Sequence, residues 1–277
     1  MNHDARRETT EPPLMGHLWP VRHRGLLLQM TLRDVAARYR QTWLGWSWVV
    51  LAPLLMLVVY TLVFRQIFQV RWSPADESSL AFALRIYAGL ALFNFFAEYV
   101  NRAPTLISEQ TQLVKKVVFP LQILPWVNLL SGLIGLGVAA VTLCVLSLLG
   151  TGRLPVTVIA LVVIWLPLLP LCLGLGWALS ALGVYVRDIG QIVGAVLTAL
   201  VFVSPVFFPV QALPRAAQAW IWLNPLADPM TQTRRVLLEG LWPDWHGWAV
   251  SMLVGSAVAV AGALLFRRLR HGFADVL

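Results

Sequence analysis

The chain has 277 residues, of which 58% are hydrophobic and only 12% are charged. A soluble domain usually carries about 25% charged residues, so this composition excludes a soluble enzyme, a disordered protein and a free nucleic-acid-binding protein. The net charge of +8 is commonly seen in membrane proteins, which retain basic residues on their cytoplasmic side.

Long apolar runs predict an all-α integral membrane protein with six transmembrane helices. A helix needs about 20 mostly apolar residues to cross the hydrocarbon layer. The predicted spans cover residues 44–64, 80–100, 124–149, 156–184, 189–208 and 247–266. With a surface helix before them they form one transmembrane domain over residues 25–266, between an N-terminal tail (1–24) and a C-terminal tail (267–277). Most of the 21 lysines and arginines fall on one side when the N-terminus is inside, which predicts that both tails are cytoplasmic.

Residues 26–40 (LLLQMTLRDVAARYR) predict an amphipathic helix that lies in the cytoplasmic membrane interface. Leu28, Leu32, Val35 and Tyr39 fall near one helical face, and polar residues occupy the rest. Such a helix suits the boundary between water and lipid. The pattern leaves two interpretations open: an anchor on the lipid surface, or a docking surface for a partner.

The connection after the second span is longer than a turn requires. Pro104 is expected to end the span, because the residue before a proline avoids helical geometry, and residues 105–116 can then form a short polar helix. Loops with surplus ordered residues often bind something. The hydrogen-bonding side chains of this segment are Ser108, Glu109, Gln110, Thr111 and Gln112.

Residues 209–246 are too long for a hairpin and too apolar for a free loop. The run 216–223 is too short to cross a membrane, and Asn224-Pro225 interrupts it. Asp228 suits a helix N-cap, Pro229 suits the first helical position, and Gly240 can end the helix. We expect two short helices that form a re-entrant pair, and such a pair lines or caps a passage.

Aromatic and polar residues share the second span. Aromatic rings usually face lipid or a neighbouring helix, but they can also line a passage and hold the apolar face of a sugar. Glu98 can pair with Arg102, one helical turn away. The candidates for a passage are Phe93, Asn94, Phe96 and Tyr99, with Tyr60 from the first span and Phe202 from the fifth.

The sequence offers little catalytic chemistry. Its two lysines, Lys115 and Lys116, do not belong to a P-loop motif, so we expect no nucleotide site of that kind. The histidines lack metal-ligand spacing, and we expect no metal and no cofactor in this chain. A membrane enzyme would need Glu98, Asp188 or Asp228 as its essential acid.

Five segments resemble the type-2 ABC exporter permeases of O-antigen, teichoic acid and capsular polysaccharides. They are RDVAARYRQTWLGWSWVVLAPLLMLVVYTLVF (33–64), LVKKVVFPLQILPWVNLL (113–130), ALGVYVRDIGQIV (181–193), SPVFFP (204–209) and WLNPLADPMTQTRRVLLEG (222–240). The resemblance runs from about Arg24 to the C-terminus, in the order of the family.

The resemblance implies a homodimer in the bacterial inner membrane, with a channel at the dimer axis and two separate ATP-binding subunits below. ATP and Mg²⁺ would bind in those subunits, and a lipid-linked polysaccharide would move outward; a permease for a drug or a small lipid is the alternative. The implied ATPase-coupling residues are Arg33, Asp34, Arg38, Ser108, Glu109, Gln110, Thr111 and Gln112. The implied outer gate contains Trp222, Asn224, Pro225, Asp228 and Pro229.

Overall fold

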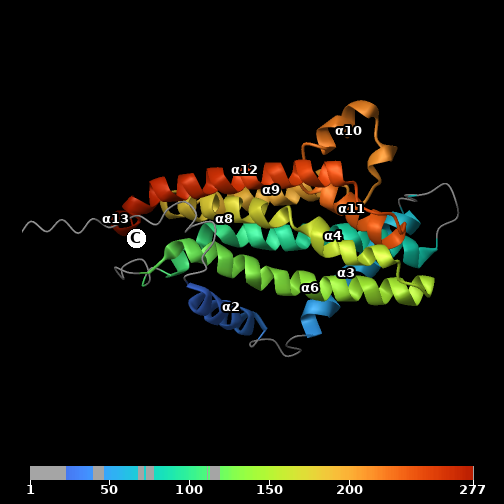
Figure 1. Ribbon diagram of the computed structural model, residues 1–277, viewed down its shortest axis with the longest axis horizontal. Helices are drawn as coiled ribbons and strands as arrows, with labels where there is room; N and C mark the ends of the chain where they lie inside the picture. The colour runs from blue at the N-terminus through green and yellow to red at the C-terminus, as the bar shows by residue number, and fades with distance from the viewer. Residues whose placement is uncertain are drawn as a thin grey trace, which may run out of the picture.

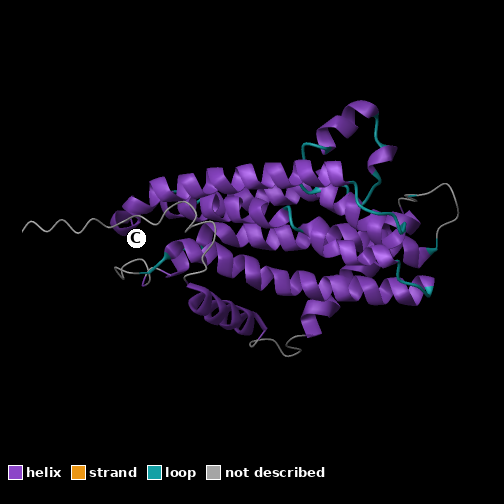
Figure 2. Cartoon of the chain, in the orientation of Figure 1, coloured by secondary structure: helices purple, strands orange, loops and turns teal. Residues whose placement is uncertain are grey.

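The computed structural model describes residues 23–39, 47–67, 72, 78–110, 112 and 119–276, and within these ranges it contains helices and no strand (Figure 2). Four helical stretches are long and apolar enough to cross a membrane: Ser79–Thr105, Leu121–Gly150, Val156–Tyr185 and Trp245–Gly272. They run side by side along the long axis (Figure 1). We call the end that carries helix α2 (Arg24–Tyr39) the α2 end, and the opposite end, which carries α11 (Ala227–Leu238), the α11 end.

Helix α4 (Ser79–Arg102) is the central helix of the bundle. It begins where the Ser78 hydroxyl accepts a hydrogen bond from the Ala81 N–H group at 3.2 Å, which satisfies one of the free donors of the first turn. Its apolar window is 72% buried, because α3, α6, α8, α9 and α11 all contact it. The α-helix ends two residues before Pro104, and 3-10 turns follow at Ala103–Thr105 and Ser108–Gln110. Ala103, directly before the proline, nevertheless keeps helical angles (φ −55°, ψ −43°), so the proline changes the type of helix here without breaking it.

The first predicted span is helical but irregular. Helix α3 (Trp48–Thr61) contains Pro53 and continues as a π-helical turn over Leu62–Ile67. An internal proline removes one backbone donor and disturbs the preceding turn. Residues 44–46 of the predicted span lie outside the described part.

Helix α6 (Leu124–Thr151) matches the third predicted span closely. A 3-10 turn at Leu121–Ile123 leads into it. It ends at Gly152, whose φ of 69° is left-handed. A residue without Cβ adopts this conformation without strain, so glycine suits this helix end.

The fourth predicted span is broken rather than straight. A 3-10 stretch (Val156–Ala160) leads into α7 (Leu161–Trp165), and α8 (Leu168–Tyr185) follows after a turn. The break falls at Leu166–Pro167 because a proline ring cannot donate the backbone hydrogen bond that a continuous helix needs.

The fifth predicted span, residues 189–208, is shorter than expected. Helix α9 covers Ile189–Val203, and Ser204 is extended with ψ of 147° because Pro205 follows it. Its 15 residues reach only about 22 Å at 1.5 Å per residue, less than the hydrocarbon layer of about 30 Å.

Helices α8 and α12 (Trp245–Leu269) form the most intimate contact in the bundle. A Cβ atom added at Gly262 would collide with the backbone of Gly174 on α8. Small residues allow such close approach of two backbones, which is common between membrane helices. Beyond α12, the short helix α13 (Phe273–Val276) returns to the bundle, with the Phe273 ring buried beside Tyr185.

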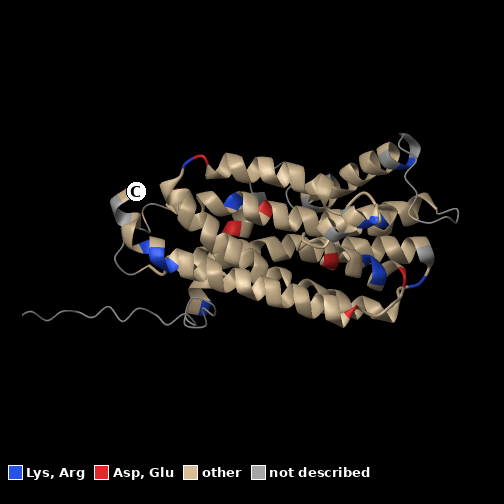
Figure 3. Ribbon diagram, turned by 90° about the horizontal axis from the view of Figure 1, so that it is seen from above, with Lys and Arg blue, Asp and Glu red and all other residues tan. Residues whose placement is uncertain are grey.

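Charged residues gather toward the two ends of the bundle, with long uncharged stretches of helix between them (Figure 3). This distribution matches an apolar layer across the middle, because a charge inside hydrocarbon costs several kcal/mol. Candidate sites are therefore found at the two ends and along the exposed faces of the helices.

Candidate functional site

Helix α2 packs beside α6 through a narrow buried stripe (Figure 1). Leu27, Thr31 and Val35 are buried, whereas Leu28 and Leu32 are 59% and 58% exposed. The i, i+4, i+8 row that starts at Leu27 thus turns toward the bundle, and Leu28 and Leu32 of the predicted apolar face lie outside it, so that their interfacial position stays a prediction. The exposed leucines leave an apolar surface beside it. The Tyr39 side chain lies outside the described part.

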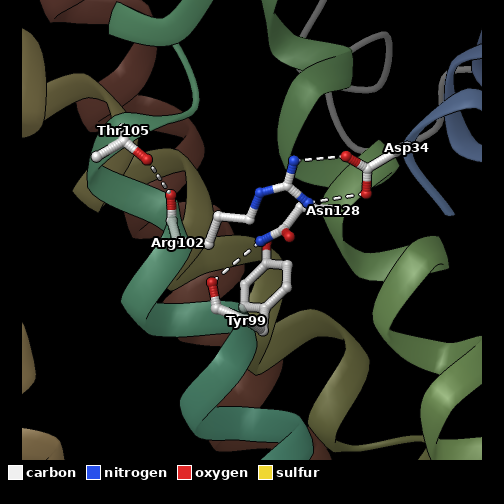
Figure 4. Close-up of polar contacts among 5 residues, drawn as sticks. All are labelled: Asp34, Tyr99, Arg102, Thr105 and Asn128. Carbon is white, nitrogen blue, oxygen red and sulfur yellow. Dashed lines mark hydrogen bonds and ion pairs between the residues drawn. The ribbon is translucent and has the colours of Figure 1, made fainter. Parts of the chain in front are cut away.

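An ion pair joins α2 to the end of the central helix. The Arg102 guanidinium donates hydrogen bonds of 2.8 and 2.5 Å to the two carboxylate oxygens of Asp34, as Figure 4 shows. This two-point geometry is stronger and more directional than a single contact. The sequence predicted Glu98 as the partner of Arg102; the structure places Asp34 in that position, because the buried stripe of α2 turns the neighbouring Asp34 toward α4.

Two further hydrogen bonds hold the same junction. The Asn128 side chain on α6 donates to the Tyr99 carbonyl oxygen at 3.0 Å, and the Thr105 hydroxyl donates to the Arg102 carbonyl oxygen at 3.2 Å (Figure 4). A buried amide that bonds a backbone carbonyl fixes the relative position of two helices. The end of α4 is thus tied to α2, to α6 and to the loop that follows it.

The predicted coupling residues converge on this junction. A cavity of about 170 Å³ lies between α2, the second 3-10 turn and α6, and Arg33, Asp34, Glu109 and Gln110 line it. Ser108 is exposed beside it, and its hydroxyl donates to the Thr105 carbonyl oxygen at 3.1 Å.

Three more predicted coupling residues complete that set. Gln112 is exposed. Thr111 and the Arg38 side chain lie outside the described part. The coupling role of all these residues stays a prediction.

The candidate passage residues separate into two groups. Phe93, Phe96 and Tyr99 are buried in the core, and the Tyr99 hydroxyl donates to the Pro125 carbonyl oxygen at 3.3 Å. These rings offer no free surface to a substrate, because α4 is surrounded by other helices. Phe202, in contrast, is 66% exposed, and Asn94 is exposed as well.

Asn94 lies in a cavity of about 200 Å³ between α3, α4 and α6. Trp48, Tyr87 and Glu98 line the same cavity. The predicted passage residue Tyr60 is half-buried, with its ring centroid 5.1 Å from that of Phe207. The four-residue spacing of Asn94 and Glu98 was a sequence signal for a shared face, but it did not reveal Trp48.

The segment between α9 and α12 forms two short helices at the α11 end. Helix α10 (Arg215–Ile221) projects from the bundle, whereas α11 packs against the bundle, mainly on α4 and α7 (Figure 1). Asn224 connects this segment to the end of α9: its amide donates to the Ser204 hydroxyl at 2.8 Å, and its carbonyl accepts from the Leu226 N–H group at 3.0 Å. Buried Asn224 thus holds the start of α11.

Asp228 is not the N-cap that the sequence predicted. Helix α11 begins at Ala227, two residues before the predicted first position Pro229, and Leu226 occupies the cap position. The Asp228 carboxylate instead accepts hydrogen bonds from Ser251 of α12 at 3.0 Å and from Gln232 at 3.2 Å. It therefore joins α11 to α12.

The other predicted gate residues differ in exposure. Pro229 is buried, whereas Trp222 and Pro225 are exposed. Gly240, with φ of 65°, follows the end of α11 as predicted.

The acidic residues that a membrane enzyme would need lie apart. Glu98 lines the cavity between α3, α4 and α6, Asp188 is exposed just before α9, and Asp228 bonds Ser251. The described residues also hold no group of three or more histidine, cysteine, aspartate or glutamate side chains that could bind a metal ion.

Sequence reasoning missed Arg234 of α11, which is only 4% exposed. Its guanidinium donates to the carbonyl oxygens of Arg85 at 2.8 Å and Val206 at 2.9 Å and lies over the Trp72 ring, 4.4 Å from its centroid. Burial, together with the neighbouring Arg85, lowers the pKa of Arg234 to about 9. A guanidinium group stays protonated in proteins, so Arg234 carries a positive charge at neutral pH. No sequence motif marked it, because its partners are distant carbonyl groups.

Replacing Asn224 with alanine is expected to release the start of α11 from α9. The substitution removes both hydrogen bonds and leaves a buried backbone donor unpaired, which costs about 1–3 kcal/mol. Hydrogen exchange should rise in residues 224–238. Trp222→Phe, at an exposed neighbour, serves as the control; unchanged exchange in the Asn224 variant would contradict this role.

Comparison with known proteins identifies the class to which this helical membrane protein belongs. Residues 25–238 match the family described as ABC-2 type transporter, so the chain belongs to that family.

Its relatives make the comparison more specific. The chain is 28% identical over 256 residues to the O-antigen export system permease protein RfbA of Myxococcus xanthus, which covers 91% of this chain and 95% of the relative. A Klebsiella pneumoniae protein of the same name is 22% identical with the same coverage. The polysialic acid transport protein KpsM of Escherichia coli is 24% identical, over 76% of this chain and 80% of its own length.

Proposed function

We propose that the chain is the permease subunit of an ATP-driven exporter that moves a lipid-linked polysaccharide across the bacterial inner membrane. The similarity to an O-antigen export permease over nearly the full length of both chains carries this proposal. A second polysaccharide transporter among the relatives supports the same substrate class. ATP would bind to a separate subunit, because the sequence has no P-loop motif.

The proposed membrane arrangement has six crossings, with the α2 end and both termini in the cytoplasm. The four long apolar stretches supply four crossings. Helix α3 with its π-turn, and α9 with the extended residues after Val203, supply the other two. Helices α10 and α11 would form the re-entrant pair at the outer mouth, where Asn224 and Asp228 hold them to α9 and α12.

A second copy would complete the passage. Helices α3 and α9 both carry exposed apolar side chains. Each of these side chains is more than half exposed: Leu55 and Val58 on α3, and Ile192 and Val196 on α9. Where such faces would otherwise meet water, their burial stabilises association by about 25 cal/mol per Å². Where they face lipid, close packing of the helices stabilises association instead. In the proposed homodimer, Asn94 and Phe202 are the predicted passage residues that keep free surface.

The junction at the α2 end would transmit the work of two ATP-binding subunits. The cavity lined by Arg33, Glu109 and Gln110 presents charged and amide groups at the proposed cytoplasmic face. The Asp34–Arg102 ion pair connects that face to α4. Movement of a docked partner would therefore reach the helix that carries Asn94.

Replacing Glu109 with alanine is expected to uncouple the ATPase partner from export. The side chain is exposed, so its loss should leave folding and membrane insertion within about 0.5 kcal/mol of wild type. Export should fall at least about tenfold, since a lost charged contact at an interface costs more than about 1.4 kcal/mol. Gln191→Ala, at an exposed position of α9, is the control, and normal export by the Glu109 variant would contradict the coupling role.

A further inference from the structure

A cavity of about 240 Å³ at the α11 end carries an excess of positive charge. Arg85, Arg234 and Arg235 line it with a single carboxylate, Glu239. Glu239 is 3.4 Å from Arg85, so it offsets one of the three charges. Two positive charges are left among the described lining residues.

Arg234 is the buried member of this group. Its guanidinium contacts two carbonyl oxygens and the Trp72 ring, and none of the described carboxylates hydrogen-bonds to it. A buried charge without an oppositely charged partner is costly. The space for it comes from Gly89, where a Cβ atom would lie 2.5 Å from the guanidinium Nη2. The fold therefore keeps a charged group at a position where burying a neutral residue would cost less free energy.

The lining of the same cavity also supplies hydrogen-bond donors. The Trp72 indole N–H group is buried and has no hydrogen-bond partner within the described part of the chain. The Gln211 amide also lines the cavity, whereas the Thr231 hydroxyl already donates to the Ala227 carbonyl oxygen at 2.8 Å. An oxyanion would accept hydrogen bonds from the Trp72 and Gln211 N–H groups and would also offset the excess positive charge. A neutral ligand could accept the hydrogen bonds but would leave the charge in place.

We propose that this cavity binds a phosphate group, held by Arg234 and Arg235 and by the indole N–H group of Trp72. A phosphate monoester carries about −1.5 to −2 charges at neutral pH, which matches the two excess positive charges better than a single carboxylate does. Arginine favours such ligands because its planar guanidinium binds two oxygens at once. The cavity volume of about 240 Å³ is large enough for a phosphate group, because it is several times the volume of about 30 Å³ that one water molecule occupies in the liquid.

Two sources could supply the group. One is the headgroup of an anionic lipid, and the other is a phosphate outside the bilayer or on the transported molecule; the second source rests on the proposed export function. Binding itself does not depend on that function, because it needs neither an ATPase partner nor transport. A failure of the phosphate site is therefore distinguishable from a failure of the export proposal.

The test is equilibrium binding of radiolabelled inorganic phosphate to the full chain in phosphatidylcholine nanodiscs. We expect saturable binding that acetate displaces at least about tenfold less effectively than unlabelled phosphate. Arg235→Gln should weaken it about tenfold, and Trp72→Phe, which keeps the ring but removes the donor, about fivefold. Arg215→Gln, an exposed arginine of α10 outside the cavity, should bind as wild type does.

A second set of nanodiscs, containing phosphatidylglycerol, identifies the source. Loss of soluble phosphate binding there assigns the site to lipid headgroups, and retained binding assigns it to phosphate from outside the bilayer. Arg234→Gln adds a further test if gel filtration shows that this variant folds. If it does not fold, Arg235→Gln and Trp72→Phe are sufficient to test the proposal. The proposal would be overturned if the wild-type chain showed no saturable binding, or if the Arg235 and Trp72 variants bound phosphate as tightly as the wild type does.

Discussion

Asparagine in place of Asp34 is expected to loosen α2 from the bundle and to abolish most export. The substitution keeps the shape of the side chain but removes the charge that faces Arg102. Hydrogen bonds to charged groups contribute about 1.5–3 kcal/mol, and this pair is partly buried, with side-chain exposures of 32% for Arg102 and 16% for Asp34. Export should fall at least tenfold, because α4 would no longer follow movement of α2.

Hydrogen exchange over residues 24–39 measures the loosening directly, and glycan export in cells measures its consequence. Asp34→Asn combined with Arg102→Gln completes a double-mutant cycle, in which the pair should show a coupling energy of about 1–3 kcal/mol. Asp188→Asn, an exposed carboxylate at the α2 end, is the matched control. A coupling energy near zero together with normal export would rule out the junction as a transmission point.

Alanine in place of Gly262 is expected to separate α8 from α12 and to destabilise the whole bundle. The new Cβ atom would collide with the carbonyl group and Cα of Gly174, which are backbone atoms and cannot rotate away. Overpacking of this kind costs about 1–3 kcal/mol. The helices would have to move apart along the most extensive contact of the bundle, so we expect the upper part of that range.

The melting temperature of the purified chain in detergent measures this effect. Gly137→Ala on α6 is the matched control, since a Cβ atom there meets nothing within 4 Å and alanine favours a helix over glycine by up to about 1 kcal/mol. The two alanine substitutions should therefore shift the melting temperature in opposite directions. Equal shifts would mean that close packing of α8 on α12 does not limit stability.

Helix positions were largely predictable from the sequence because apolar runs and prolines act locally. The run after Leu124 becomes α6 almost residue for residue, and α4 ends just before Pro104. The same local rule was applied too weakly at Pro167 and Pro205, where the structure breaks the fourth predicted span and shortens the fifth.

The facing of side chains was not predictable for the central helix. A helix that is apolar all round is buried by other helices or by lipid, and the pattern does not distinguish the two. Phe93, Phe96 and Tyr99 therefore fitted a passage as well as a core, and the structure places them in the core. Of the four predicted passage residues on this helix, Asn94 is the exposed one.

Long-range pairs also required the structure. Asp34 and Arg102 are 68 residues apart, and Arg234 is 149 residues from the Arg85 carbonyl group that it binds. A single sequence contains the charges but not their distances. The sequence therefore suggested Glu98, the nearest carboxylate along the chain, as the partner of Arg102, whereas the fold supplies Asp34.

Export by a reconstituted complex tests the central claim most directly. The chain would be placed in liposomes with an ATP-binding subunit from the same cell and a lipid-linked polysaccharide, and glycan on the far side of the membrane would be measured with an impermeant lectin. We predict that lectin-accessible glycan rises with ATP and Mg²⁺ and stays at background when either the chain or its partner is omitted. Glycan that reaches the far side equally without ATP or without the chain would contradict the account.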